Sequence, residues 1–178
     1  MGITKEPILK TQFCTYFDHN YLVRGLAMIE SLRKNFSNFE VWVLCLSDEC
    51  KTVVDKLKKK EIRSVSLSSL ESANPNLLEA KKNRSKVEYY FTLSPFWPSW
   101  ILENFNDISG ITYLDADLEF FSSPQVLFDR LENYSIGIID HRFHSLYDHT
   151  RYAGRFNVGF VYFKNDEIGN SCLKKWKL

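Results

Sequence analysis

The chain has 178 residues, of which 44% are hydrophobic and 25% are charged, and its formal net charge is +1. This length and composition favour one globular domain, and we interpret residues 1–178 as a single domain with its own core. The balanced charge provides no basic field for nucleic acid, so no nucleic-acid partner is expected. The longest uncharged stretch, 89–102, is too short to span a bilayer, which predicts no transmembrane segment.

Hydrophobic patterning predicts alternating strands and helices from the N-terminus onward. Between residues 12 and 67, three apolar runs alternate with two helical stretches, an order typical of an α/β sheet with crossover helices. The predicted strands are 12–17, 40–46, 62–67, 110–114, 135–140 and 156–164. The predicted helices are 22–36, 48–59, 87–105, 124–131 and 168–176, with a short helix or loop in 68–83. Pro95 and Pro98 are expected to kink or restart the helix that contains them.

The cysteines and the N-terminus bear on the cellular compartment. The four cysteines form no CxxC pair and have no zinc-finger spacing, which favours free thiols in a reducing compartment. Residues 1–10 contain no apolar segment typical of a signal peptide. We therefore expect a cytoplasmic protein, with the membrane surface as an alternative location.

Two aspartates, Asp115 and Asp117, directly follow the apolar run 111–114. Alternate residues of an extended chain point to the same side, so both carboxylates are expected to aim at one spot. Hard oxygen ligands of this kind suit Mg²⁺ or Mn²⁺, ions that usually bind phosphate oxygens as well. The pair therefore predicts a metal site for a substrate that bears a phosphate or diphosphate.

Other interpretations of this pair compete with the metal site. Aspartates in a surface turn can simply bond their own backbone. An EF-hand loop is excluded because Phe120 stands where that loop requires glycine. The pattern is also similar to phosphatases whose first aspartate attacks phosphorus, but Glu119 stands where they have threonine or valine. An aspartyl-phosphate phosphatase is kept as the less favoured alternative.

The segment 111–124, ITYLDADLEFFSSP, resembles the D-x-D region of GT-A nucleotide-sugar glycosyltransferases. Residues 15–32, 84–95 and 154–166 are similar, in the same order, to the first strand and helix, the helix before D-x-D, and the strand after the donor-sugar site. The nearest set is the family-8-like, retaining-type transferases. The resemblance implies a GT-A-like, Rossmann-like α/β fold with a mostly parallel sheet flanked by helices. Because such chains usually continue further, this one resembles the donor-binding part without its C-terminal part.

The resemblance also implies a function and a set of site residues. It implies a metal-dependent glycosyltransferase, hexosyltransferase-like, that moves a sugar from a nucleotide-diphosphate donor, with a UDP-sugar favoured, to a hydroxyl of an unknown glycan, lipid or protein. Mn²⁺ or Mg²⁺ would be held by Asp115 and Asp117. The donor-binding residues would be Phe17 and Asp18 at the nucleobase, Arg84 at a phosphate or the sugar, Asp115 at the ribose, and Asn157 at sugar hydroxyls. No catalytic residue is assigned.

Plainer interpretations remain open for the same residues. Phe17 could be a core aromatic and Asp18 a helix cap, while Arg84 could be a solvated surface side chain and Asn157 a turn residue. The chain as a whole could be a nucleotide-sugar-binding module that performs no turnover.

Overall fold

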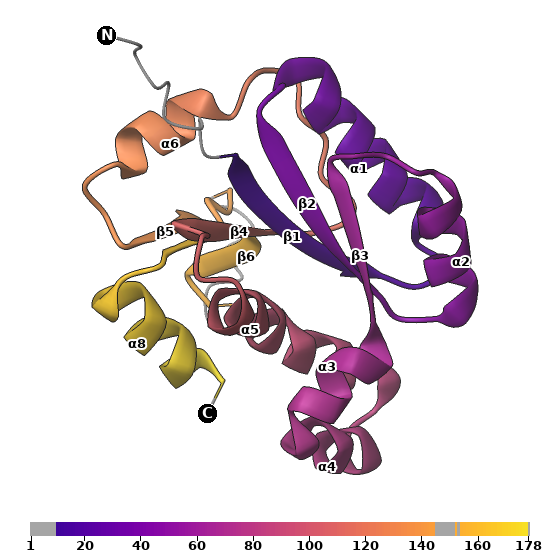
Figure 1. Ribbon diagram of the computed structural model, residues 1–178. Helices are drawn as coiled ribbons and strands as arrows, with labels where there is room; N and C mark the ends of the chain where they lie inside the picture. Colours follow the sequence, from indigo (N-terminus) through magenta and orange to yellow (C-terminus); the bar gives the residue numbers. More distant parts are fainter. Residues whose placement is uncertain (1–9, 145–151, 153, 178) are drawn as a thin grey trace, which may run out of the picture.

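The computed structural model describes residues 10–144, 152 and 154–177 (Figure 1). Within these residues, six strands form one sheet in the order β3-β2-β1-β4-β6-β5. Strands β1, β2, β3 and β4 are mutually parallel, and β6 runs antiparallel to both β4 and β5. The strands are β1 (Thr11–Phe17), β2 (Phe39–Cys45), β3 (Ile62–Ser66), β4 (Gly110–Leu114), β5 (Ile136–Asp140) and β6 (Phe156–Lys164). The predicted α/β fold with a mostly parallel sheet is confirmed.

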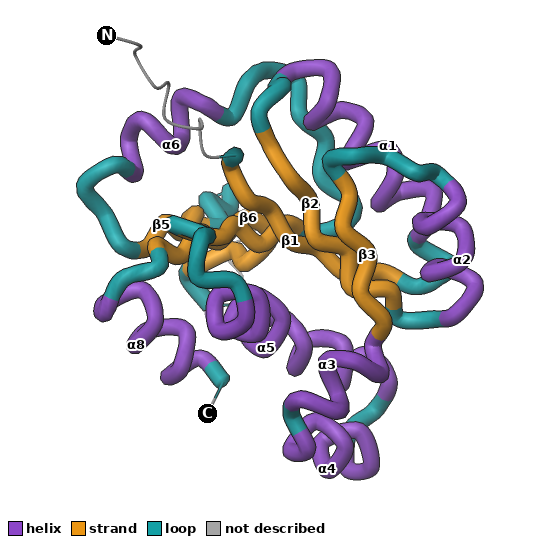
Figure 2. Tube along the Cα trace, in the orientation of Figure 1, coloured by secondary structure: helices purple, strands orange, loops and turns teal. Residues whose placement is uncertain are grey.

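Helices cover both faces of this sheet (Figures 1 and 2). Helices α1, α2 and α6 lie on one face, and α3, α4, α5 and α8 lie on the other. They are α1 (Leu22–Asn35), α2 (Asp48–Lys56), α3 (Leu67–Ala73), α4 (Pro75–Asn83), α5 (Lys86–Asn104), α6 (Gln125–Leu131) and α8 (Glu167–Trp176). None of the helices in the described ranges is long and apolar enough to cross a membrane.

Each face of the sheet has its own apolar core. Every residue of β2 is buried, as its nearly continuous apolar run requires in a strand covered on both faces. On the α1 face, Met28 and Leu32 pack with Phe13 of β1. On the α5 face, the buried residues recur every fourth position, so they form one stripe along the helix. These α5 residues are Tyr89, Leu93, Trp97 and Ile101.

Of the kink or restart expected at Pro95 and Pro98, the restart does not occur. Both prolines lie inside α5, which runs unbroken from Lys86 to Asn104. A proline removes one helical hydrogen bond and crowds the preceding turn. Here the buried stripe continues on both sides of the prolines, so packing against the sheet holds the helix together despite that local cost.

Candidate donor-binding and metal site

A cavity of about 410 Å³ opens at the carboxyl ends of the parallel strands. Its walls come from the segment after β1, the segment after β4 and the first turns of α5. This is the edge where open α/β sheets bind ligands. Among the described residues that line it, the charged side chains are Asp18, Lys86, Asp115 and Asp117, which leave the cavity a formal charge of −2.

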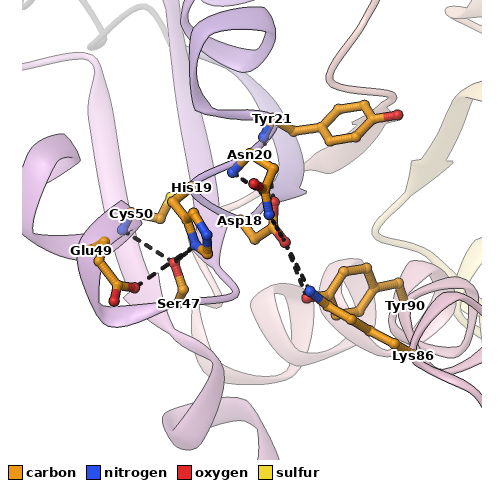
Figure 3. Close-up of polar contacts among 9 residues, drawn as sticks. All are labelled: Asp18, His19, Asn20, Tyr21, Ser47, Glu49, Cys50, Lys86 and Tyr90. Atoms are coloured by element: carbon orange, nitrogen blue, oxygen red, sulfur yellow. Dashed lines mark hydrogen bonds and ion pairs between the residues drawn. The ribbon is translucent and has the colours of Figure 1, made fainter.

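Asp18 lines this cavity and accepts several hydrogen bonds (Figure 3). Its Oδ1 accepts from the backbone N–H groups of Asn20, at 3.0 Å, and Tyr21, at 3.3 Å. Its Oδ2 accepts from Lys86 Nζ at 3.2 Å and from the Tyr90 hydroxyl at 3.5 Å. Burial alone would raise the pKa of Asp18, but the hydrogen bonds from Lys86 and Asn20 outweigh it and lower that pKa. Asp18 is therefore a buried carboxylate that stays ionised and only accepts hydrogen bonds.

Asp115 also lines the cavity and is held between two strands. Its backbone N–H donates to the carbonyl of Gly159 on β6 at 2.9 Å, and its Oδ1 accepts from the Tyr113 hydroxyl at 2.8 Å. The Tyr113 ring lies 5.6 Å from that of Tyr16, whose hydroxyl bonds Ser94 of α5. Burial raises the pKa of Asp115, the Tyr113 hydrogen bond opposes this, and the nearby Asp117 charge adds to the rise.

We predict that Tyr113→Phe lowers the free energy of unfolding by about 1–2 kcal/mol, because it removes the hydroxyl that bonds the half-buried Asp115 carboxylate. Tyr113 is only 2% exposed, so the loss should register fully in urea denaturation. Tyr134→Phe is the matched control: Tyr134 is 63% exposed, and its change should fall within about 0.5 kcal/mol. Equal stability of the two variants would contradict a structural role for the Tyr113–Asp115 bond.

Asp117 differs from Asp115 in being exposed and unrestrained. Its side chain forms no hydrogen bond or ion pair with the other described residues, while its charge raises the pKa of Asp115. The described part of the chain contains no group of three or more histidine, cysteine or acidic side chains that could hold a metal. Two carboxylates suit Mg²⁺ or Mn²⁺ nonetheless, because these ions usually complete their shell with water and substrate phosphates. The donor set thus fits such an ion.

The other predicted site residues are placed as follows. Phe17 borders the cavity, but its ring is core: it is 2% exposed and fills the space that a side chain at Gly25 would need. Arg84 donates to the hydroxyl of Thr92 and lies outside the residues that line the cavity. Asn157 lies near Asp115, because the Oδ1 atom of Asn157 and the Oδ2 atom of Asp115 both face Gly159. The Asn157 Oδ1 also accepts a hydrogen bond from the Gly159 N–H at 2.7 Å.

Sequence reasoning missed several residues that line the cavity, chiefly Tyr21, Lys86 and Tyr90. A signal was available for the latter two. Ser85 and Glu88 form a capping box that starts α5 at Lys86. Lys86 and Tyr90 are then four residues apart on one helix face, which here looks into the cavity. Tyr21 had no comparable signal, because its position depends on how the segment after β1 turns into α1.

The mostly parallel sheet with helices on both faces is the GT-A glycosyltransferase fold. Residues 13–173 match Glycosyl transferase family 8, and the chain belongs to this family.

Two relatives and one solved structure illustrate the similarity. The chain is 29% identical to YfnF and 31% identical to YfnD of Bacillus subtilis (strain 168), over 95% and 93% of its length. It spans only 57% and 53% of those proteins. The crystal structure of mouse xyloside xylosyltransferase 1 superposes with a TM-score of 0.64 at 18% identity, over 94% of this chain and 73% of that one. At this identity the likeness demonstrates the shared fold.

Proposed function

We propose that the chain is the donor-binding part of a metal-dependent glycosyltransferase, which moves a sugar from a nucleotide-diphosphate donor to an acceptor hydroxyl of a glycan, lipid or protein. The observation that supports this proposal is that Asp18 and the Asp115–Asp117 pair line one and the same cavity. A nucleoside at Asp18 and a diphosphate at the acidic pair would be two parts of one ligand, as they are in a nucleotide sugar.

The chemistry of Asp18 supports a UDP-sugar as the donor. An ionised carboxylate only accepts hydrogen bonds, so a base recognised there must present an N–H group. Uracil offers its N3–H and guanine its N1–H, whereas the same ring position of cytosine is an acceptor. Asp18 therefore favours uracil or guanine over cytosine, and a uracil ring is the smaller of the two for a cavity of about 410 Å³.

The charge of the cavity supports metal dependence. A formal charge of −2 repels a diphosphate, so the anion needs a cation to enter. Asp115 and Asp117 would hold Mn²⁺ or Mg²⁺, which supplies charge neutralisation to the diphosphate leaving group when bound. Tyr113 would keep Asp115 in place during this step, since its hydroxyl fixes one carboxylate oxygen.

Two other functions remain to be compared with this one. A nucleotide-sugar-binding module without turnover would use the same cavity and differ only in carrying out no transfer. The aspartyl-phosphate phosphatase has no support, because the matching family consists of glycosyl transferases.

Calorimetric titration with UDP, with and without Mn²⁺, tests the proposal. We expect binding in the presence of Mn²⁺ and affinity at least about 100-fold lower in its absence, because the ion links the carboxylates to the diphosphate. CDP should bind more weakly than UDP. Equal affinity with and without metal would reject the metal-dependent function. If UDP binds but UDP-glucose yields neither transfer nor hydrolysis, the binding module is favoured instead.

A further inference from the structure

Asp18, in the conformation that the structure shows, has no acceptor site left for a ligand. Five donor groups surround its two oxygens: the N–H groups of Asn20 and Tyr21, the Asn20 side-chain amide, the Lys86 ammonium and the Tyr90 hydroxyl. A carboxylate offers about four lone-pair positions. The residue is also only 6% exposed. A nucleobase N–H can therefore reach Asp18 only if one of these donors leaves.

The Tyr90 hydroxyl is the most distant of these donors, at 3.5 Å, and Lys86 is the charged donor that can leave. The backbone donors belong to the turn into α1, and the Asn20 amide lies two residues from Asp18 in the same turn. By contrast, the Lys86 side chain is 65% exposed, and it extends from the first residue of α5 on a flexible four-carbon stem (Figure 3). The capping box at Ser85 fixes the helix start, so the side chain can swing without moving the backbone.

The ammonium needs another anion when it leaves Asp18. It is the one cationic side chain among the described residues that line the cavity, and Asp115 and Asp117 line the same cavity. Release into this space without a partner forfeits the charge-assisted bond to a buried carboxylate, which is among the stronger hydrogen bonds in proteins. A diphosphate attached to the incoming nucleoside supplies the replacement anion.

We propose that Lys86 is a specificity-determining residue that frees Asp18 for a base only when the same ligand brings a phosphate group to accept the ammonium. The inference rests on the proposed function, because it assumes that Asp18 receives the base. It makes the site selective for nucleoside diphosphates over nucleosides. Selection arises because one lysine serves two anions in turn, so base and phosphate binding are coupled.

The test compares uridine and UDP as ligands of the wild type, Lys86→Met and Lys86→Arg, in competition calorimetry with Mn²⁺ present. In Lys86→Met we expect uridine to bind about 5-fold tighter, because an Asp18 oxygen is free, and UDP about 10-fold weaker, because a phosphate partner is lost. The selectivity for UDP over uridine should thus contract by about 50-fold. Lys86→Arg keeps the charge and should retain most of the selectivity. Lys82→Met is the matched control, since Lys82 is 74% exposed on α4 outside the cavity lining and should change neither affinity.

The outcomes separate this inference from the proposed function. If wild-type protein binds no UDP, the proposed function fails and this inference fails with it. If wild type binds UDP but Lys86→Met weakens uridine and UDP equally, or alters neither, the exchange is wrong and Lys86 is a static partner of Asp18. Circular dichroism of each variant shows whether the fold is kept. If Lys86→Met is unfolded, Lys86→Arg provides the test instead. Equal affinities of Lys86→Arg for uridine and UDP would also overturn the exchange.

Discussion

Replacing Asp117 with alanine is expected to abolish the Mn²⁺-dependent binding of UDP while leaving the fold intact. Asp117 is the exposed, unrestrained member of the acidic pair and is free to coordinate an ion directly. Loss of an outer-shell partner alone typically costs about 10–100-fold in metal affinity, so loss of a direct ligand should cost at least about 100-fold. Calorimetric titration of the variant with Mn²⁺ and UDP measures this loss.

The stability of the same variant distinguishes a binding role from a structural one. Asp117 has no partner within the described part of the chain, so its removal should change the free energy of unfolding by no more than about 0.5 kcal/mol. Any change should be toward greater stability, since the substitution relieves repulsion of Asp115. Asp107→Ala is the matched control, an exposed aspartate just before β4 at the opposite edge of the sheet. Undiminished metal-dependent binding by Asp117→Ala would remove the basis of the metal site.

Asp18→Asn is expected to lower the affinity for UDP by about 100-fold and to reduce the ratio of the UDP affinity to the CDP affinity. The amide replaces one acceptor oxygen with an NH₂ donor, which cannot accept the N3–H of uracil but can donate to N3 of cytosine. The hydrogen bond from uracil to the Asp18 carboxylate is charge-assisted, and the loss of such a bond costs about 1.5–3 kcal/mol. Affinities for UDP and CDP, measured with Mn²⁺ in the same buffer, give the preference directly.

This substitution also has a structural cost that must be separated from the effect on binding. The new NH₂ group faces the donors of Asn20, Lys86 and Tyr90, so we expect the free energy of unfolding to fall by about 1–2 kcal/mol. Asp129→Asn on α6, at an exposed position away from the cavity, should change neither stability nor binding. If Asp18→Asn reduced UDP and CDP affinity by the same factor, Asp18 would not read the base.

The fold was largely predictable because its signals are local. The apolar run at β2, the polar caps and the 3.6-residue periodicity of α1 each constrain a short segment, and the predicted strands agree with the observed ones to within about two residues. A restart at Pro95 and Pro98, one of the two expected outcomes, does not occur because long-range burial of the α5 stripe outweighs the local helix-breaking residues. Segment 68–83 forms two short helices, which its polar composition could not distinguish from a loop.

The candidate site was predictable only in part. Asp18, Asp115 and Asp117 follow strands, and parallel strands bring their carboxyl ends to one edge, so their convergence follows from topology. The contributions of α5 do not follow in this way. Arg84 and Lys86 are two residues apart in the same basic cluster, yet Lys86 reaches the cavity while Arg84 bonds Thr92. The start of the helix decides between them, because it sets the direction in which each side chain points.

By itself, the sequence determined the order of the strands and helices, the acidic pair after β4 and the family to which the chain belongs, because each depends on residues close together in the chain. The tertiary structure alone decided that Tyr113 anchors Asp115, that the Phe17 ring is core, and that Lys86 pairs with Asp18 across 68 residues. Lys86 and Asp18 come from distant segments, whereas Tyr113 and Asp115 are only two residues apart and Phe17 and Gly25 eight, yet the meeting of their side chains is set by tertiary packing too. Their geometry depends on how α5 and α1 pack against the sheet, and packing is a property of the whole fold rather than of any local pattern.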